Sequence, residues 1–335
     1  MDEYEPNAVG AAALAANPGG SRRTRALASW ASALGLAAVL VPVVLRLTGW
    51  ERGPLAYAVA FLPWVVPACV VPLALALLAR SRVLAAAVLV PLIASVAWLV
   101  PVFTASSVAS AAPAELRVAT LNATMGQADA SAIVAMVADR SIDVLAVEEL
   151  TPAEVDALHA AGLDDALPYS ELLPQLGVEG TGVWSRLQFN SAMSVQGLRS
   201  HAVRVSVTVG KEPVTIYAVH PAAPGLFDHS TWATDMAKLA ALLAPRNGAV
   251  LVAGDFNTTR DQRSFRELED LGFADAADQA GAGFLPTFPQ GRLPLPVVAI
   301  DHIIARDVPF VARDVTAVTI PGADHRALVV TYAGP

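Results

Sequence analysis

Residues 252–259 read Val-Ala-Gly-Asp-Phe-Asn-Thr-Thr, and this stretch decides the fold. It continues the apolar, β-branched run of residues 249–252, which predicts a short buried strand. We expect Gly254 to end that strand and let the backbone turn, so that Asp255 and Asn257 project the same way from its carboxyl end. A carboxylate beside a carboxamide suits a hard cation or a phosphate oxygen. The alternative is an Asx turn that only caps the following helix.

The apolar residues of the chain are concentrated in its first third. Of its 335 residues, 55% are hydrophobic and the mean hydropathy is +0.51, which is too apolar for an ordinary soluble protein. Residues 26–103 are almost free of charge, whereas residues 115–335 have the composition of a globular domain. That domain carries 15 Lys+Arg and 26 Asp+Glu, a net charge of −11 that disfavours gripping a long polyanion. The single cysteine, Cys69, predicts no disulfide partner and no zinc cluster.

Three apolar segments are each close to the roughly 20 residues that cross a bilayer. We predict transmembrane helices at about residues 26–45, 54–79 and 83–103, with the second kinked or broken by its prolines. A signal peptide is disfavoured because the first segment is too long and further spans follow. Residues 1–25 are predicted to be a disordered cytoplasmic tail, and residues 104–114 a small-residue linker that holds the next domain close to the bilayer.

Charges beside the spans predict their orientation. Five arginines flank the predicted spans on one side and two on the other, namely Arg22, Arg23, Arg25, Arg80 and Arg82 against Arg46 and Arg52. Because positive charge accumulates on the cytoplasmic side, the N-terminus is expected inside and the C-terminal domain, after three crossings, outside. The chain is therefore predicted to be a multi-pass membrane protein with an extracytoplasmic domain. A two-span hairpin, with the proline-rich segment not crossing fully, would reverse this orientation.

After the linker, short strands alternate with helices. Strands are predicted at residues 116–122, 143–149, 182–185, 191–196, 202–209, 214–220, 297–305, 314–320 and 327–332, and helices at about 128–140, 231–243 and after the capping box of residues 151–154. Strands outnumber helices, and the helices fall between groups of strands. This order predicts two packed sheets with helices outside.

Polar residues recur where these strands end. They are Asn122, Glu149, His220, Asp255, Asn257, Asp301, Asp324 and His325. Taken singly, His220 is more typical of a structural histidine, and Asp324 of a turn cap. Asp301 lies among β-branched residues and requires a partner, because an unpaired buried charge costs several kcal/mol. As a set, these residues indicate a functional site.

Seven short motifs occur in a characteristic order over residues 116–333. They are Leu121-Asn122, Asp143 to Leu150, Trp184-Ser185-Arg186, Val219-His220, Gly254-Asp255-Phe256-Asn257, and the closing pair Ile300-Asp301-His302-Ile303 and Ala323-Asp324-His325-Arg326. Together they resemble the endonuclease/exonuclease/phosphatase superfamily, which includes DNase I-like nucleases, sphingomyelinases and inositol-phosphate phosphatases. Glu148 takes a position that this superfamily often fills with Gln.

This resemblance implies a fold, a cofactor and a role for each residue. The fold is a four-layer αββα sandwich, and the activity is metal-dependent hydrolysis of phosphoric esters. Glu149, helped by Asn122, would hold Mg²⁺ or Mn²⁺, and Asp324 would complete the metal or water network. His325, oriented by Asp301, would position or deprotonate the attacking water, and Asp255 would be the other base or hold a second ion. His220 and Asn257 would donate hydrogen bonds to the phosphoryl oxygens, and Arg186 would bind substrate.

Three functions compete. The favoured one is a membrane-anchored phosphodiesterase or phosphatase that acts outside the cytoplasm on a lipid-linked or envelope phosphate. Membrane lipid is then a partner of its transmembrane helices. A surface nuclease is less favoured, because residues 150–182, between two motif strands, contain no lysine or arginine with which to grip DNA or RNA. The weakest is an inactive binding domain on a membrane anchor, because every motif position holds a chemically competent side chain.

Overall fold

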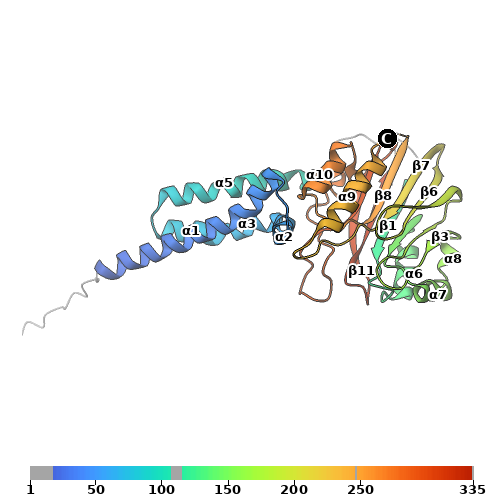
Figure 1. Cartoon of the computed structure of the whole chain (residues 1–335), viewed down its shortest axis with the longest axis horizontal. Helices are drawn as coiled ribbons and strands as arrows, with labels where there is room; N and C mark the ends of the chain where they lie inside the picture. Colours follow the sequence, from blue (N-terminus) through green and yellow to red (C-terminus); the bar gives the residue numbers. More distant parts are fainter. Residues whose placement is uncertain (1–17, 107–114, 246, 334–335) are drawn as a thin grey trace, which may run out of the picture.

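The structure, a computed structural model, describes residues 18–106, 115–245 and 247–333. A bundle of apolar helices extends from one side of a two-sheet sandwich (Figure 1). Among the described residues, two helices are long and apolar enough to cross a membrane, or three when the bent pair within residues 54–78 counts as one span. The predicted tail lies outside the described residues as far as residue 17.

The first helix, α1 (Pro18–Thr48), begins earlier than the sequence predicted. Residues 18–25, expected to be part of a disordered tail, form its first turns. Proline is tolerated in the first turn of a helix, and the arginines that follow are good helix formers. Inside the bundle, the Ser32 hydroxyl donates to the carbonyl oxygen of Pro72 at 2.8 Å and so ties α1 to the second apolar segment.

That second segment is broken, as its prolines predicted. It consists of α2 (Pro54–Ala60), the 3-10 turn η1 (Leu62–Trp64), α3 (Val65–Ala68) and α4 (Val70–Leu78), with a bend of 60° after α2. The third segment comprises α5 (Arg82–Leu99) and the 3-10 turn η2 (Val100–Phe103). The turn before α5 lies at the end of the bundle far from the sandwich, whereas α2 and the end of α5 lie beside it (Figure 1).

Twelve strands in the described residues form the sandwich. They are β1 (Glu115–Asn122), β2 (Val144–Glu148), β3 (Tyr169–Leu173), β4 (Thr181–Ser185), β5 (Phe189–Val195), β6 (Ala202–Val209), β7 (Glu212–Val219), β8 (Ala249–Asp255), β9 (Ala274–Asp275), β10 (Asp301–Arg306), β11 (Val311–Thr319) and β12 (Arg326–Ala333). One sheet has the order β11-β12-β1-β2-β4-β3 and the other β5-β6-β7-β8-β10-β9. The pairs β1–β2 and β7–β8 are parallel, and the remaining pairs are antiparallel.

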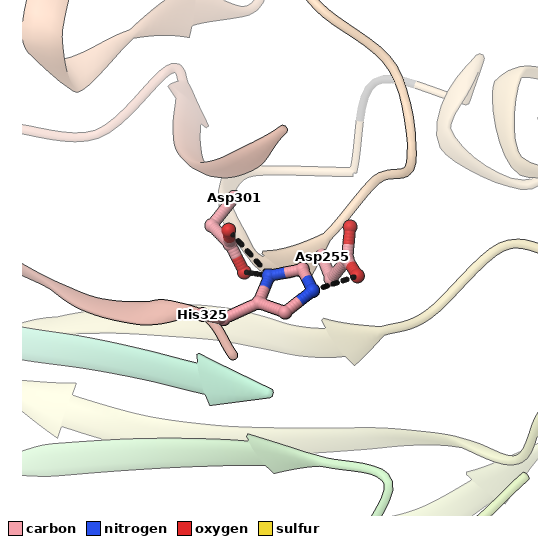
Figure 2. A group of neighbouring side chains, drawn as sticks. All are labelled: Asp255, Asp301 and His325. Carbon is pink, nitrogen blue, oxygen red and sulfur yellow. Dashed lines mark hydrogen bonds and ion pairs between the residues drawn. The ribbon is translucent and has the colours of Figure 1, made fainter. Parts of the chain in front are cut away.

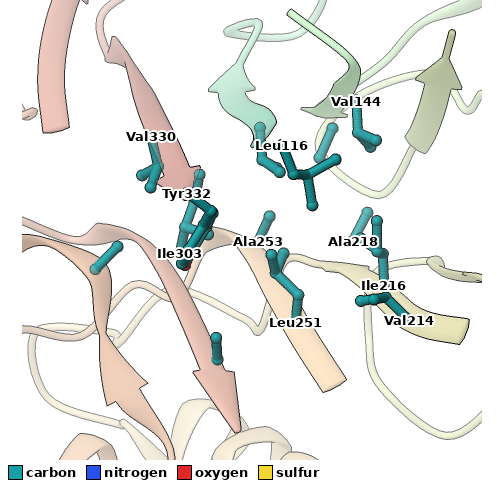
Figure 3. Packing of buried hydrophobic residues seen from close by; sticks show 14 of the residues in the cluster. Leu116, Val144, Val214, Ile216, Ala218, Leu251, Ala253, Ile303, Val330 and Tyr332 are labelled. Atoms are coloured by element: carbon teal, nitrogen blue, oxygen red, sulfur yellow. The ribbon is translucent and has the colours of Figure 1, made fainter. Parts of the chain in front are cut away.

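Helices cover both outer faces of the sandwich. They are α6 (Ala130–Asp139), α7 (Pro152–Ala160) and α8 (Leu163–Ala166) on the first sheet, α9 (Ser230–Leu243) and α10 (Arg263–Asp270) on the second, and the short α11 (Ala276–Ala280) beside β11. The main core lies between the sheets, where Leu116, Val144 and Tyr332 of one meet Ile216 and Leu251 of the other (Figure 3). The predicted four-layer α/β sandwich is confirmed.

Three local predictions need correction. Strand β3 was not predicted. The strand expected from residue 297 begins only at Asp301, because Val298 bridges to Phe288 instead. Gly254 does not end its strand, since β8 continues to Asp255. A Cβ atom on Gly254 would lie 1.9 Å from the carbonyl oxygen of Val219, so glycine is required there by close backbone approach.

The helical bundle is docked on the sandwich through buried polar contacts. The Glu51 carboxylate accepts the Arg263 backbone N–H at 2.9 Å, at the start of α10. Gln262 Nε2 donates to the carbonyl oxygen of Ala56 in α2 at 3.1 Å. Arg260 donates to the carbonyl oxygen of Trp98 near the end of α5, also at 3.1 Å. Because two separate segments of the bundle contact the sandwich, the bundle is held in one orientation.

The start of the predicted linker is also docked. The Ser106 backbone N–H donates to the carbonyl oxygen of Gln279 in α11 at 2.8 Å. Residues 107–114 of the linker lie outside the described residues. The described contacts therefore fix residues 104–106 to the sandwich, rather than leaving them as free spacer.

Candidate active site

Six strand termini meet at one edge of the sandwich. β1, β2, β7 and β8 end there, and the antiparallel strands β10 and β12 begin there. The register therefore gathers eight of the nine predicted site residues in one place: Asn122, Glu149, His220, Asp255, Asn257, Asp301, Asp324 and His325.

His325 is held between two buried carboxylates. Its Nδ1 lies 2.9 Å from Asp301 Oδ2, and its Nε2 lies 3.7 Å from Asp255 Oδ2 (Figure 2). The Phe288 ring packs against the imidazole, with the ring centroids 4.7 Å apart. All three polar side chains are buried, so their mutual geometry is fixed by packing as well as by hydrogen bonds.

The charges of this group are set by its surroundings. Burial lowers the pKa of His325, but the carboxylates of Asp301 and Asp255 outweigh that effect and raise the pKa to about 10. The imidazole therefore carries protons on both nitrogens at neutral pH and acts as a hydrogen-bond donor. Burial raises the pKa of Asp255, against the opposing charge of His325. Asp255 is thus the member of the group that is suited to accept a proton.

Asn122 links this group to Glu149. Its Nδ2 donates to Glu149 Oε1 and to Asp255 Oδ2, both at 3.1 Å. Its own amide oxygen accepts the Thr124 backbone N–H at 2.9 Å. The Met125 backbone N–H donates to Glu149 Oε2 at 2.8 Å. Asn122 therefore holds the two acids together through its amino group, while its amide oxygen faces the Thr124 backbone N–H.

Glu148 lies behind the site and is completely buried. Burial, together with the negative charge of Asp301, raises the pKa of Glu148 well above its ordinary value. Thr120 Oγ1 donates to its Oε1 at 2.9 Å. A raised pKa favours the protonated form of the carboxyl group, which resembles glutamine in shape.

His220 and Asn257 approach Asp255 from the second sheet. His220 Nδ1 donates to the carbonyl oxygen of Val178 at 3.2 Å, which leaves Nε2 facing Asp255 Oδ2 at 3.6 Å. The Asn257 backbone N–H donates to Asp255 Oδ1 at 2.8 Å, which is the Asx turn considered as the alternative. Asn257 Nδ2 donates to the carbonyl oxygen of Pro221 at 3.0 Å. The turn and the site thus coexist, because the turn fixes the Asp255 carboxylate.

Asp324 lies at the open side of the group. Thr124 Oγ1 donates to its Oδ1 at 2.7 Å, and Arg292 Nη2 lies 2.8 Å from its Oδ2. His325 Nε2 is 4.0 Å away. The exposed Arg292 side chain therefore places one positive charge at the rim of the site.

Arg186 is not part of this group. It follows β4, whose last residue, Ser185, pairs with the first residue of β2. Glu148 ends β2 at the site, so Arg186 lies at the opposite end of that strand. There its side chain contacts Asp143 and the carbonyl oxygen of Ile142. The antiparallel direction of β4 carries the Ser-Arg motif away from the site, and the structure does not support the predicted substrate-binding role.

The donor set fits a divalent metal ion. Four carboxylates, those of Glu149, Asp255, Asp301 and Asp324, gather near two imidazoles, and Asp255, Asp301 and His325 present ligand atoms within 4.8 Å of one another. Each oxygen of Glu149 accepts one described hydrogen bond and keeps a lone pair for a further partner. Carboxylate oxygens are the ligands that hard divalent ions prefer, and an ion would offset the excess negative charge.

Sequence reasoning missed several residues of the site. Thr124 and Met125 bind the acids through a hydroxyl and a backbone N–H, and Phe288 packs on the imidazole of His325. Tyr57 and Phe61, from the apolar segment, line a cavity that also reaches His325. Phe288 and the apolar segment that carries Tyr57 and Phe61 belong to no motif and are distant in sequence from most of the site residues. Only the packing of the folded chain reveals their position.

Comparisons with known proteins agree with this geometry. The sequence profile of the Endonuclease/Exonuclease/phosphatase family matches residues 119–325. A search of curated protein sequences finds no match.

Several solved structures share the fold. TDP2 from D. rerio, complexed with a single-strand DNA product, has a TM-score of 0.52 at 18% identity and covers 65% of this chain and 98% of its own. An endonuclease/exonuclease/phosphatase from Beutenbergia cavernae has a TM-score of 0.53 at 20% identity, and the match covers 66% of this chain and 72% of its own. An endonuclease/exonuclease/phosphatase family protein from Bacteroides thetaiotaomicron has a TM-score of 0.51 at 14% identity, and the match covers 66% of this chain and 98% of its own. With its fold, motif order and profile match in agreement, the chain belongs to the endonuclease/exonuclease/phosphatase family, whose members are metal-dependent phosphoester hydrolases.

Proposed function

We propose that this protein is a membrane-anchored phosphoesterase that acts outside the cytoplasm on the phosphate of a lipid or of a lipid-linked envelope component. One observation carries the proposal: the apolar bundle packs against the same edge of the sandwich that carries the site. Tyr57 of α2 donates from its hydroxyl to the carbonyl oxygen of Pro224, and Gln262 of the sandwich donates to Ala56 of α2. A substrate reaching His325 therefore approaches from the side of the bilayer.

The arrangement of the bundle supports the predicted orientation. α1 and α5 both reach the sandwich at their carboxyl ends, through the 3.5 Å contact of Arg46 with Asp261 and the contact of Trp98 with Arg260. The segment between them crosses back to the turn before α5. Three crossings separate the sandwich from the arginines at the other end of the bundle, which the positive-inside rule assigns to the cytoplasm.

Each side chain has a role in the proposed hydrolysis. His325 donates a hydrogen bond that positions the attacking water or a phosphoryl oxygen, and Asp301 orients its ring. Asp255 accepts the proton of the water as it attacks phosphorus. His220 Nε2 and Asn257 face the same place and would stabilise the negative charge that builds on the phosphoryl oxygens.

Glu149, with Asn122 beside it and Asp324 close by, would hold Mg²⁺ or Mn²⁺. When bound, such an ion supplies positive charge that neutralises a phosphate oxygen. The Asn122 amino group, which donates to both Glu149 and Asp255, keeps the two acids together. Thr124 keeps Asp324 aimed at the same place through its hydroxyl group.

A substrate panel tests this proposal directly. The purified full chain in phospholipid nanodiscs should hydrolyse lipid phosphates with Mg²⁺ or Mn²⁺ and lose that activity with EDTA, while plasmid DNA and nucleotides are turned over poorly. Rapid cleavage of DNA with no lipid activity would favour the surface nuclease. Absence of hydrolysis across phospholipids, nucleotides, DNA and chromogenic phosphodiesters would favour the inactive binding domain.

A further inference from the structure

An apolar groove leads from the helical bundle to the imidazole of His325. It has a volume of about 460 Å³ and lies between α2 on one side and the segment of residues 288–300 on the other. Tyr57, Ala60 and Phe61 form its bundle wall, and Asn257 and His325 lie at its inner end. A groove of this size falls within the range of small-molecule binding sites.

The chemistry of the groove changes along its length. Apart from His325, no residue that lines it carries a charge. Between its ends, the polar side chains of the described lining are hydrogen-bonded within the protein: Tyr57 donates to Pro224, and Gln262 both donates to Ala56 and accepts from the Thr259 backbone N–H. The middle of the groove therefore offers no free partner to a polar ligand and favours hydrocarbon. Its inner end reaches Asn257 and His325 of the candidate active site.

The mouth of the groove is surrounded by exposed apolar side chains. Leu293, on the wall opposite α2, is 47% exposed, and Phe61 is 43% exposed. Leu226 and Phe227, whose carbonyl oxygens lie close to Gly53 at the start of α2, are 54% and 83% exposed. Exposed apolar side chains on both sides of α2, beside helices long enough to span a membrane, suit a surface at the lipid boundary.

We infer that this groove binds one hydrocarbon chain of a phosphate-bearing lipid, so that the membrane segment forms half of the substrate site instead of serving only as an anchor. The inference rests on the proposed function. The occupant follows from three features: an apolar passage, an inner end at the proposed phosphoesterase site, and a mouth beside the bilayer. Nucleic acid lacks a chain that would fill the passage, and a basic lining to receive its backbone is missing from the described walls.

Ala223 provides a way to close the groove without touching the site. It is an exposed loop residue that lines the groove, so a larger side chain there projects into open space. Ala223→Trp should fill the passage and leave the Asp301–His325 pair intact. Ala153→Trp is a matched control, because Ala153 is also exposed but lies on α7, on the outer face of the other sheet.

Two chromogenic substrates separate chain binding from chemistry. Hexadecyl 4-nitrophenyl phosphate and methyl 4-nitrophenyl phosphate share the scissile bond and leaving group and differ only in the hydrocarbon chain. With the full chain in nanodiscs, Ala223→Trp should lower kcat/KM for the hexadecyl ester at least about tenfold, equivalent to losing about two buried CH₂ groups, and leave the methyl ester within about twofold. Ala153→Trp should change neither. Equal losses for both esters, or no loss for either, would overturn the groove assignment.

A binding measurement keeps this test separate from the proposed function. Hexadecyl phosphate with a photoactivatable diazirine in its chain should cross-link to peptides containing Phe61 or Leu293, and Ala223→Trp should abolish these cross-links. If the cross-links form but no ester is hydrolysed, the groove stands and the proposed activity fails. If esters are hydrolysed but the labelled peptides lie elsewhere, the activity stands and the groove assignment fails.

Discussion

Asp301 lies directly opposite Asp255 in the antiparallel register of β10 and β8, so two buried carboxylates project toward the same imidazole. Like charges facing each other across a strand pair are destabilising. His325, protonated on both nitrogens, balances this repulsion, and that balance explains why its pKa is raised to about 10 despite burial. The strand register thus places one acid on each side of a cationic imidazole.

The first prediction concerns this pair. His325→Ala should lower turnover by roughly 10²–10⁴-fold, because a general acid–base or donor group is removed. Asp301→Asn should cost less, since it only loosens the orientation of the ring. The double variant should be little worse than His325→Ala alone, because residues that act as one unit are not additive. Single-turnover rates measure these effects.

Thermal melting of the same variants provides the control. Preserved melting temperatures with lost turnover support the proposed roles. If melting temperature falls in parallel while the remaining folded protein turns over normally, Asp301 and His325 form a structural pair.

The second prediction concerns the metal. Glu149→Gln should remove most hydrolysis and the stabilisation that Mg²⁺ or Mn²⁺ gives to the wild-type protein, which should reach a few kcal/mol at saturating concentration. Without added metal, the variant should stay folded and melt slightly below the wild type, because the single amide oxygen of glutamine can replace only one of the two oxygens that accept from Asn122 and Met125. Differential scanning calorimetry across a metal titration measures the effect. An unchanged metal response in Glu149→Gln would rule out Glu149 as a ligand.

The third prediction concerns stability and pH. Glu154 is buried on α7, and its Oε1 has no hydrogen-bond partner among the described residues. Burial, helped by the charge of Asp129, raises the pKa of Glu154 from 4.5 to about 7. The folded state therefore binds the proton more tightly than the unfolded state. The resulting stability is complete below pH 4.5 and is lost as the pH rises through about 7.

Glu154→Gln should remove this dependence, because glutamine is neutral at every pH and retains capping capacity in the first turn. At pH 8 the variant should melt at a higher temperature than the wild type, and at pH 4 the two should differ little. Melting curves from pH 4 to 8 test the prediction. Parallel pH profiles for the two proteins would show that Glu154 titrates normally.

The fourth prediction concerns the side of the membrane on which the sandwich lies. Five arginines against two predict that residues 115–335 lie outside the cytoplasm. An alkaline-phosphatase domain fused after Pro335 should therefore be active in cells, and a green fluorescent protein fused there should be dark. The opposite pair of results would place the sandwich in the cytoplasm and exclude an external substrate.

Much of the site could be predicted from the sequence because strand ends carry its chemistry. Asp255, Asp301 and His325 each stand at the end or start of a β-branched run, and parallel strands bring such ends to one edge. The predicted place of Arg186 in the site was wrong, because the direction of β4 depends on its partner strand, and local sequence does not encode that pairing. Phe288 and Phe61 could not be predicted, since an apolar side chain in a loop or span has no signature until the chain is folded.

The boundaries that were wrong have similar causes. Helix α1 begins at Pro18 because the charged residues before the apolar span are themselves helix formers, and hydropathy alone does not register them. Gly254 was assigned to a turn from its sequence context, whereas its backbone lies against Val219 of the neighbouring strand. Contacts between strands decide such positions.

The most direct measurement is metal-dependent phosphate-ester hydrolysis by the full chain in nanodiscs, comparing wild type with Asp255→Asn on a lipid phosphate and on single-stranded DNA. Asp255→Asn removes the proton acceptor at the centre of the site and nearly preserves its shape. We predict that wild type hydrolyses the lipid phosphate far faster than DNA, and that Asp255→Asn melts normally but loses roughly 10²–10⁴-fold in turnover. Undiminished hydrolysis by a folded Asp255→Asn, or DNA cleavage that exceeds lipid hydrolysis, would contradict the account.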